Sequence, residues 1–476
     1  MGKHRLPIVR IVLFPGLLAL LLSSVASLSA AGQTSVDSVE KALTFLQQID
    51  PEKVTAANEE KIIKQIEDAW DVIHKAGPAG TARLKQEIAR PNQSDYFKLN
   101  GAALLWSIGG LDEAETISSV WGSTRLEVQS NYVFYPAFEA GQKQDPRALP
   151  MLRAVLGNNK FKIYVALHSM DVSWPLTIQF IWGSYGPQAL PILLDVLKNS
   201  RVPAEVQSAI VLSATDQYLE ALPRIRELAH AKDDETQRVA INALGFFGHP
   251  EDYDFLIAGL GSQDQEDVFR YEIALYEYED LRAVPHLIPL LGSRDRKIRH
   301  EAFADLSHLL TSQSLDALVK YAQEVQGEER AEVDDYLNSE LKEYKLSVDA
   351  YMKKSPVEKA QTIGAVRKQR EARRFSLHPG ERGLTHSELV AATEAWKSSH
   401  HMRMSSGEMP VSVAQLLSAT TANDIDLLLK VKAAVYGRLS DECLDEVERI
   451  DSAVKRLGRS RYRKHVGVTE KVEPRQ

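Results

Sequence analysis

The chain of 476 residues is 44% hydrophobic and 26% charged, with a formal net charge of −8 at pH 7. This composition supplies ample material for packed cores, and the length predicts two or three domains or one extended array. The net charge is −17 over residues 32–339 and +6 over residues 340–476. That asymmetry indicates an acidic body with a basic tail, and it is too weakly basic to indicate nucleic-acid binding.

Residues 1–31 have the pattern of a secretory signal peptide. Lys3, Arg5 and Arg10 precede a short apolar core over residues 11–22, and small residues follow it. We expect cleavage before Gly32 and export to the periplasm or secretion, with an uncleaved anchor over residues 11–31 as the alternative. No later run of about 20 apolar residues occurs, so no transmembrane segment is expected after signal removal.

Cys443 is the only cysteine of the chain. We therefore expect the exported protein to hold together by packing, without intramolecular disulfides. The thiol lies in the charged helical pattern "LSDECLDEVERI", and no base is identifiably placed beside it. It is interpreted as incidental rather than catalytic.

Residues 32–144 predict an N-terminal helical cap followed by degenerate repeats. The stretch "VDSVEKALTFLQQI" places Asp37 and Glu40 in capping-box spacing and Val39, Leu43 and Leu46 on one helical face. A second helix is expected in "EEKIIKQIEDAWDVIHKAG", and weaker repeat units are expected at residues 80–110 and 113–140.

A period of 31 residues organises residues 145–345. Four apolar phrases follow one another at that spacing, beginning at Ala209, Ala240, Tyr271 and Ala302. The segment before each phrase carries a proline at nearly the same period, at Pro191, Pro223 and Pro285, with Asp254 in the remaining unit. Each unit is therefore predicted to be two helices, and stacked units would share one core.

The residues of one unit explain this prediction. Pro223 suits the first turn of a helix, where its missing N–H has no intrahelical partner. Asp233 and Asp234 supply a polar turn and an N-cap before the second helix. The inner face of that helix is expected to comprise small and branched residues that let neighbouring helices approach closely, namely Val239, Ala240, Ala243 and Leu244.

This arrangement, with "AINALGFFG" in a second helix, resembles HEAT repeats, and among them the short bacterial HEAT-like repeats of the phycobilisome-lyase type. The resemblance covers residues 145–310 most clearly. It implies an all-α fold, a right-handed α-α superhelix or HEAT-like solenoid with a C-terminal helical extension, that binds a partner. The family shares no reaction and no fixed ligand-binding residues, and the signal peptide argues against lyase activity itself.

The step from Pro150 to Pro191 is 41 rather than 31 residues, which places an insertion in or near residues 157–175. One interpretation is a longer loop or a solvent-facing hairpin between helices. The functional alternative is a ligand-gripping loop in which Phe161, Tyr164 and Trp174 contact the partner.

The period is lost after a charged helix predicted at residues 329–346, which would close the array. Residues 346–385 are expected to form a basic linker, residues 386–466 a C-terminal helical region, and residues 467–476 a disordered tail. The helical region is predicted either as a small domain or as an appendage that docks back on the solenoid.

Known catalytic patterns are missing from the sequence. It contains no P-loop, dinucleotide fingerprint, Gly-x-Ser-x-Gly or EF-hand loop. His300 and Glu301 begin like a zinc-protease helix, but Ala304 stands where the second histidine is needed. His308 lies two turns on, on a similar face, so surface or groove histidines are expected instead. We predict no enzyme, no catalytic residue and no cofactor.

Two C-terminal segments suggest other ligands. Copper is an alternative ligand for a cluster of imidazoles and thioethers at His400, His401, Met402, Met404 and Met409, which is otherwise interpreted as a flexible loop. An anionic envelope component is a possible partner for the cations Arg456, Arg459, Arg461, Arg463 and Lys464, which could equally be solvated or neutralise the acidic solenoid.

The sequence as a whole predicts an exported, non-enzymatic scaffold for protein–protein interactions in the cell envelope, with an unidentified protein partner. Equivalent positions of successive second helices should point the same way and are the candidate binding residues: Gln207, Arg238, Phe269 and His300. The alternative function is periplasmic copper handling through residues 400–409.

Overall fold

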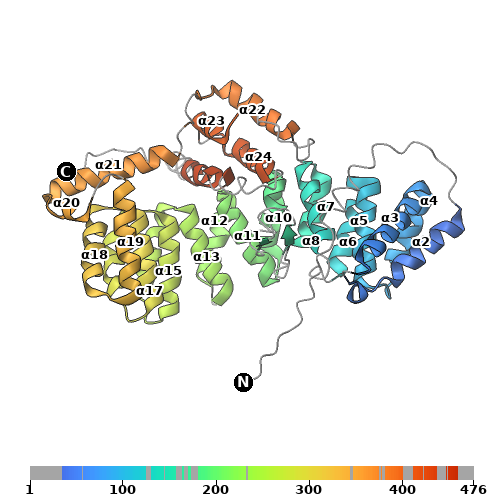
Figure 1. Ribbon diagram of the computed structural model, residues 1–476, viewed down its shortest axis with the longest axis horizontal. Coiled ribbons are helices and arrows are strands. Elements are labelled where there is room, and N and C mark those ends of the chain that lie inside the picture. The colour runs from blue at the N-terminus through green and yellow to red at the C-terminus, as the bar shows by residue number, and fades with distance from the viewer. Residues whose placement is uncertain are drawn as a thin grey trace, which may run out of the picture. The chain divides into compact units, whose positions relative to one another are not determined.

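The computed structural model is built almost entirely of helices and comprises two compact units, residues 1–192 and 193–476 (Figure 1). It describes residues 35–55, 57–124, 130–143, 145–156, 163–165, 170–172, 181–231, 234–343, 347–374, 377, 381–399, 411–421, 423–436, 446–447 and 449–458. The expected signal peptide and tail lie outside these ranges. Within them, no helix is long and apolar enough to cross a bilayer.

In unit 1 the helices pack on helices that lie close to them in the chain, as α2 does on α3 and α5 on α6 and α7. Its helices are α2 (Val36–Gln48), α3 (Glu59–Lys75), α4 (Gly77–Ile88), α5 (Asp95–Gly109), α6 (Ala114–Ser123), α7 (Ser130–Gln142) and α8 (Leu149–Val155). Short 3₁₀ turns are η2 (Pro51–Lys53), η3 (Gly110–Glu113), η5 (Pro146–Ala148) and η6 (Gly186–Ala189). The boundary of this unit lies well beyond residue 144, where the sequence predicted one.

Helix α2 begins directly after Ser35, whose hydroxyl accepts a hydrogen bond from the Ser38 backbone N–H at 3.2 Å. The capping box predicted at Asp37 and Glu40 is therefore wrong, because both residues already lie inside the helix. Glu40 instead binds Arg83 of α4, with 3.0 Å between Nη2 and Oε2. The predicted apolar face of α2 is buried, as expected.

The insertion contains a short β-hairpin. Strands β1 (Ile163–Val165) and β2 (Met170–Val172) pair antiparallel, with Tyr164 opposite Asp171. A hairpin is thus present at this place, and the ligand-gripping role of the insertion remains a prediction. The hairpin is the exception, among the described residues, to an otherwise all-α solenoid.

Unit 2 contains the predicted helix pairs. Its second helices are α11 (Pro203–Thr215), α13 (Asp234–Phe247), α15 (Gln265–Tyr278) and α17 (Arg296–Leu309), whose first residues are 31 apart. The first helices are α10 (Leu190–Asn199), which spans the unit boundary, α12 (Leu222–Ala229), α14 (Tyr253–Gly259) and α16 (Val284–Leu287). Turns η7 (Leu219–Ala221), η8 (Pro250–Asp252), η9 (Leu281–Ala283) and η10 (Ile288–Gly292) accompany them. The prediction of two helices per unit is confirmed.

Close packing of the second helices forms the core of the repeats. Of the four residues predicted to form the inner face of α13, Ala240, Ala243 and Leu244 are at most 2% exposed, whereas Val239 is only half-buried. A Cβ atom on Gly245 would lie 2.1 Å from the carbonyl oxygen of Ala274, so α13 and α15 approach too closely there for any side chain. Small residues at these positions therefore set the helix spacing, as the sequence predicted.

Each second helix ends in a left-handed residue. The positive φ angles fall at Gln217 (56°), Gly248 (60°), Glu279 (55°) and Leu310 (42°), again 31 residues apart. Only Gly248 has the residue type that this conformation favours. The other three carry a strain of about 1 kcal/mol each, which the repeated turn imposes on them.

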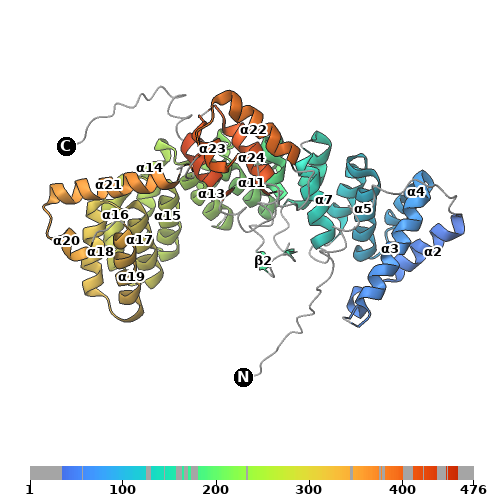
Figure 2. The same cartoon turned by 45° about the horizontal axis from the view of Figure 1, so that its top comes forward.

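Further helices follow the repeats. They are α18 (Ser312–Glu324), α19 (Gly327–Glu343), α20 (Val348–Met352), α21 (Pro356–Arg374), α22 (His386–Ser399), α23 (Val413–Ser418) and α24 (Ile425–Tyr436), and residues 449–458 are also helical. Figure 2 shows α22, α23 and α24 gathered in one group, and α22 contacts α24. These helices lie within residues 386–466, the range in which the sequence predicts a helical region.

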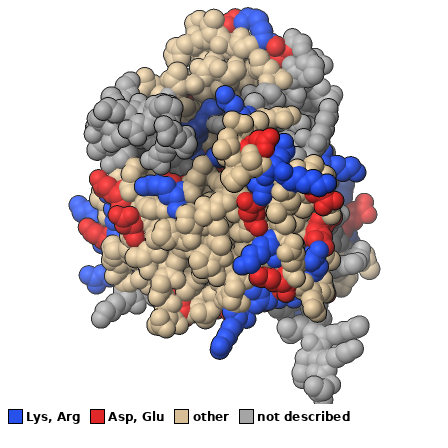
Figure 3. All heavy atoms as spheres, turned by 90° about the vertical axis from the view of Figure 1, so that its left-hand side faces the viewer, with Lys and Arg blue, Asp and Glu red and all other residues tan. Residues whose placement is uncertain are grey.

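The range expected as a basic linker, residues 346–385, contains α20 and α21 instead. Ser347 caps α20 by accepting a hydrogen bond from the Ala350 N–H, and Tyr351 is fully buried. Lys359 of α21 lies 2.8 Å from Asp316 of α18. A cap, a buried aromatic ring and an ion pair therefore order a stretch that its basic composition made look irregular. Figure 3 views this end of the molecule and shows cations and anions interspersed over it.

Candidate interaction surface

The four candidate binding residues occupy the same place in successive helices. Gln207, Arg238, Phe269 and His300, here called the N-terminal row, are each the fifth residue of α11, α13, α15 and α17. The first three are half-buried and His300 is exposed. Since each of these helices packs on the next, the structure carries the four side chains at one end of a continuous helical layer.

Three members of the N-terminal row each have a charged group nearby. The Lys297 ammonium lies 5.9 Å from the centre of the Phe269 ring. Arg238 pairs with Glu235 one turn earlier on α13. His300 Nδ1 lies 3.2 Å from Glu332 Oε1 on α19. The row therefore contains a phenylalanine and an arginine, residue types that protein interfaces favour, together with an exposed imidazole.

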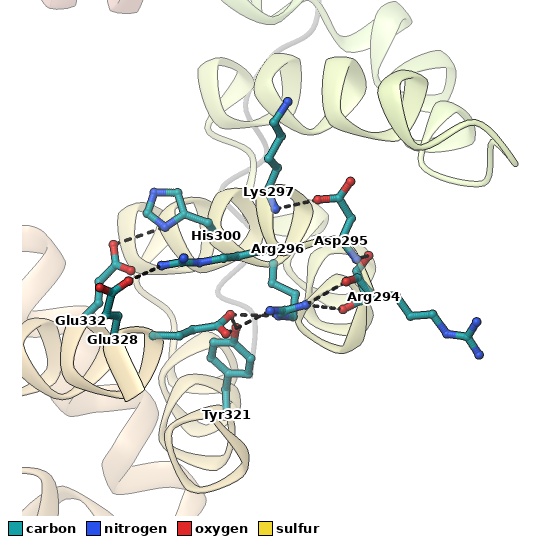
Figure 4. A network of polar contacts seen from close by, with 11 residues as sticks. Arg294, Asp295, Arg296, Lys297, His300, Tyr321, Glu328 and Glu332 are labelled. Atoms are coloured by element: carbon teal, nitrogen blue, oxygen red, sulfur yellow. Dashed lines mark hydrogen bonds and ion pairs between the residues drawn. The ribbon is translucent and has the colours of Figure 1, made fainter. Parts of the chain in front are cut away.

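A polar network fixes the part of the row nearest the end of the repeats (Figure 4). Arg299 binds Glu329 in bidentate fashion, at 2.9 and 3.0 Å, and the hydroxyl of Tyr321 also donates to Glu329. The Arg299 guanidinium lowers the pKa of the Glu329 carboxyl, so this pair stays ionised. Figure 4 shows Arg296 and His300 directed toward Glu328 and Glu332.

Two fully buried carboxyl groups lie deeper in the same helices. Glu272 of α15 and Asp305 of α17 are both 0% exposed, and none of their carboxyl oxygens has a hydrogen-bond partner among the described residues. Burial, followed by the charge of Glu301, raises the pKa of Glu272 to about 9. Burial raises the pKa of Asp305 well above its usual value, with Glu272 adding to the shift. Glu272 is therefore protonated at neutral pH, and burial disfavours the ionised form of Asp305 in the same way.

The histidines weighed as zinc ligands contact different neighbours. His300 faces Glu332 of α19, whereas His308 Nε2 lies 3.3 Å from Glu279 and its ring lies 4.7 Å from that of Tyr276 on α15. They do not share a face, contrary to the expectation from their spacing. No group of three or more His, Cys, Asp or Glu that could hold a metal ion occurs within the described ranges.

The sequence did not identify the contact made at the opposite ends of the second helices. Lys432 of α24 lies 2.8 Å from Asp216 and 2.6 Å from Asp451. Lys455 lies 2.9 Å from Glu277 and 3.5 Å from Glu279. The C-terminal helices thus dock on the repeats, one of the two alternatives that the sequence left open, and the opposite charges of the two regions were the signal for it.

Most of the remaining predicted site residues lie outside the part of the chain that the structure describes. Tyr164 lies in β1, while Phe161 and Trp174 lie outside the described residues. The histidine and methionine segment at residues 400–409 and the cations from Arg459 onward also lie outside them. The copper hypothesis and the anionic envelope partner remain predictions.

Comparison with known proteins supports the interpretation of the repeats. Residues 190–276 match the family described as HEAT repeats. No curated protein matches the chain. A solved structure of human deoxyhypusine hydroxylase in complex with glycerol is 17% identical, covers 56% of this chain and 96% of its own, and has a TM-score of 0.23. That score is too low to carry information about fold or activity. The family match and the observed helix pairs together identify residues 190–276 as HEAT repeats.

Proposed function

We propose that the protein is an exported, non-enzymatic scaffold that binds a protein partner through the N-terminal row of its HEAT repeats. Such repeats present a periodic surface suited to protein binding. The observation that carries the proposal is the placement of Gln207, Arg238, Phe269 and His300 at one position of four helices packed side by side.

Phe269 and Arg238 are the expected centre of the contact. A half-buried aromatic ring offers apolar area at little cost in side-chain entropy, and an arginine stands at the equivalent position of the neighbouring helix. Residues of these types dominate interface energies. The exposed ion pair of Arg296 and Glu328, with side chains 63% and 90% exposed, contributes little by comparison. We therefore expect the binding energy to concentrate on Phe269 and Arg238.

The test is affinity capture with the tagged mature chain, residues 32–476, from its extracytoplasmic compartment. Replacing both residues (Arg238→Ala and Phe269→Ala) should reduce partner recovery at least about tenfold, because truncating a central pair removes a few kcal/mol of binding. The control replaces an exposed lysine and an exposed valine elsewhere in unit 2 (Lys320→Ala and Val357→Ala). Full recovery by the first double variant, at unchanged thermal stability, would reject the N-terminal row as the binding surface.

Export is tested separately by the mass of the mature chain. We expect the chain recovered outside the cytoplasm to begin at Gly32. A chain that retains residues 1–31 and remains bound to the membrane would contradict cleavage and favour the anchor.

A further inference from the structure

The C-terminal ends of the second helices form a second surface, distinct from the N-terminal row. We call it the acidic ridge, and it comprises Asp216, Gln217, Phe246, Glu277 and Glu279. Three of its members are carboxylates, and they come from the ends of α11 and α15, with Phe246 of α13 between them. The ridge therefore places an aromatic ring among negative charges.

Residues 449–458 of the same chain cover this ridge. Lys455 binds both Glu277 and Glu279, and its ammonium lies 5.3 Å from the centre of the Phe246 ring. Three residues later, Gly458 lies so close to Gln217 that an added Cβ would stand 2.6 Å from Oε1. A lysine and a glycine at helical spacing thus fit three successive repeats.

The two lysines of the C-terminal helices hold the ridge differently. Lys432 is 4% exposed and is shared by Asp216 and Asp451, so it joins α24, residues 449–458 and the repeats. The side chains of Lys455, Glu277 and Glu279 are 14%, 23% and 31% exposed. Water reaches the second contact, which weakens it and makes it the easier one to exchange.

We propose that the acidic ridge is a binding site for a basic helix. In this state residues 449–458 occupy the site, and a lysine-bearing helix of a partner protein competes with them for it. The charges favour this occupant, because the repeats lie within a region of net charge −17 and the covering helix within one of net charge +6. The inference goes beyond the proposed function, since it concerns the other end of the same helices.

The test uses the full chain and a synthetic peptide with the sequence of residues 449–458, which carries three cations and one anion. The wild-type chain should bind the peptide weakly, because its own segment occupies the ridge. Reversing one charge of that segment (Lys455→Glu) should strengthen peptide binding at least about tenfold, as the competing state is depopulated. The control reverses an exposed lysine of α18 (Lys320→Glu) and should leave the affinity unchanged.

Two further measurements show whether the peptide binds at the ridge itself. Adding Glu277→Lys and Glu279→Lys to the Lys455→Glu chain should abolish peptide binding and restore slow amide exchange over residues 449–458, because the ion pairs are re-formed with exchanged signs. The double substitution in the N-terminal row should leave peptide binding unchanged. Equal peptide affinity of wild type and Lys455→Glu, no binding to either, or unaltered amide exchange in Lys455→Glu would each overturn the proposal.

Discussion

Replacing the buried carboxyl group of Glu272 by an amide should stabilise the protein at neutral and alkaline pH. Glu272→Gln keeps the size of the side chain and removes its ionisation. The group is 0% exposed, neither carboxyl oxygen has a hydrogen-bond partner in the part of the chain that the structure describes, and its pKa is raised to about 9. An unfolded chain instead ionises it near its ordinary pKa of 4.5.

The sign and the size of the effect follow from proton linkage. Between these two pKa values the folded chain keeps a proton that the unfolded chain has lost. Stability is therefore complete below pH 4.5 and falls as the pH rises toward 9. The loss amounts to about 1.4 kcal/mol per pH unit, or about 3 kcal/mol at pH 7 as an upper bound. We expect Glu272→Gln to raise the free energy of unfolding by about 1–3 kcal/mol at pH 7.

Urea denaturation at pH 5, 7 and 9 measures the difference. The gain over wild type should grow with pH and be smallest at pH 5, because, of the three, this pH lies closest to the unfolded-state pKa of 4.5. The control is an exposed glutamate of the same helix (Glu266→Gln), which should change stability by no more than about 0.5 kcal/mol at any pH. The reasoning is refuted if Glu272→Gln gives the same stability change at all three pH values.

Three further predictions test the packing. Lys432→Ala should destabilise unit 2 by about 3 kcal/mol in urea denaturation, since Asp216 would be left buried without its cation. The control Lys320→Ala should leave stability nearly unchanged. Similar effects of the two substitutions would argue against the buried ion pair. Gly245→Ala should lower the free energy of unfolding by about 2–4 kcal/mol, because its Cβ would overlap the Ala274 carbonyl. The control Gly364→Ala has no atom near its Cβ and should stabilise α21 by up to about 1 kcal/mol. Equal effects of the two substitutions would contradict the close approach of α13 and α15. Burial lowers the pKa of His249 to about 4, so its contribution to stability is present above its ordinary pKa of 6.5 and is lost as the pH falls toward 4. His249→Asn should therefore make the melting temperature less dependent on pH between 6.5 and 4. An unchanged pH dependence of the melting temperature would contradict the lowered pKa.

The 31-residue period of the repeats was recognisable in the sequence because apolar residues recur at that spacing. Alanine and leucine at a fixed spacing predicted where α11, α13, α15 and α17 lie. The buried carboxyl groups were missed because acidic residues are usually solvated, yet aligning the units reveals them. Glu272 stands where two other units have Ile210 and Ile241, and Asp305 stands where the preceding one has Ala274.

Contacts between segments far apart in the chain were harder to predict from the sequence. The opposite charges of the repeats and the C-terminal region predicted an attraction, but nothing along the chain pairs Lys455 with Glu277, which lies 178 residues earlier. Such pairing depends on the relative rotation of two helices, which composition does not determine. The structure of residues 346–385 was likewise hidden, since Tyr351 orders α20 only by burial against residues far from it in sequence.

The left-handed residue at the end of each second helix also bears on how such a chain can change length. The chain reverses at Gln217, Gly248, Glu279 and Leu310 through one backbone conformation, although their side chains share no chemistry. The turns between successive units are therefore interchangeable. When a whole unit is duplicated or lost, the units that become neighbours are still joined by a turn of the same conformation. Evolution can lengthen the array in steps of one unit and refine the side chains afterwards.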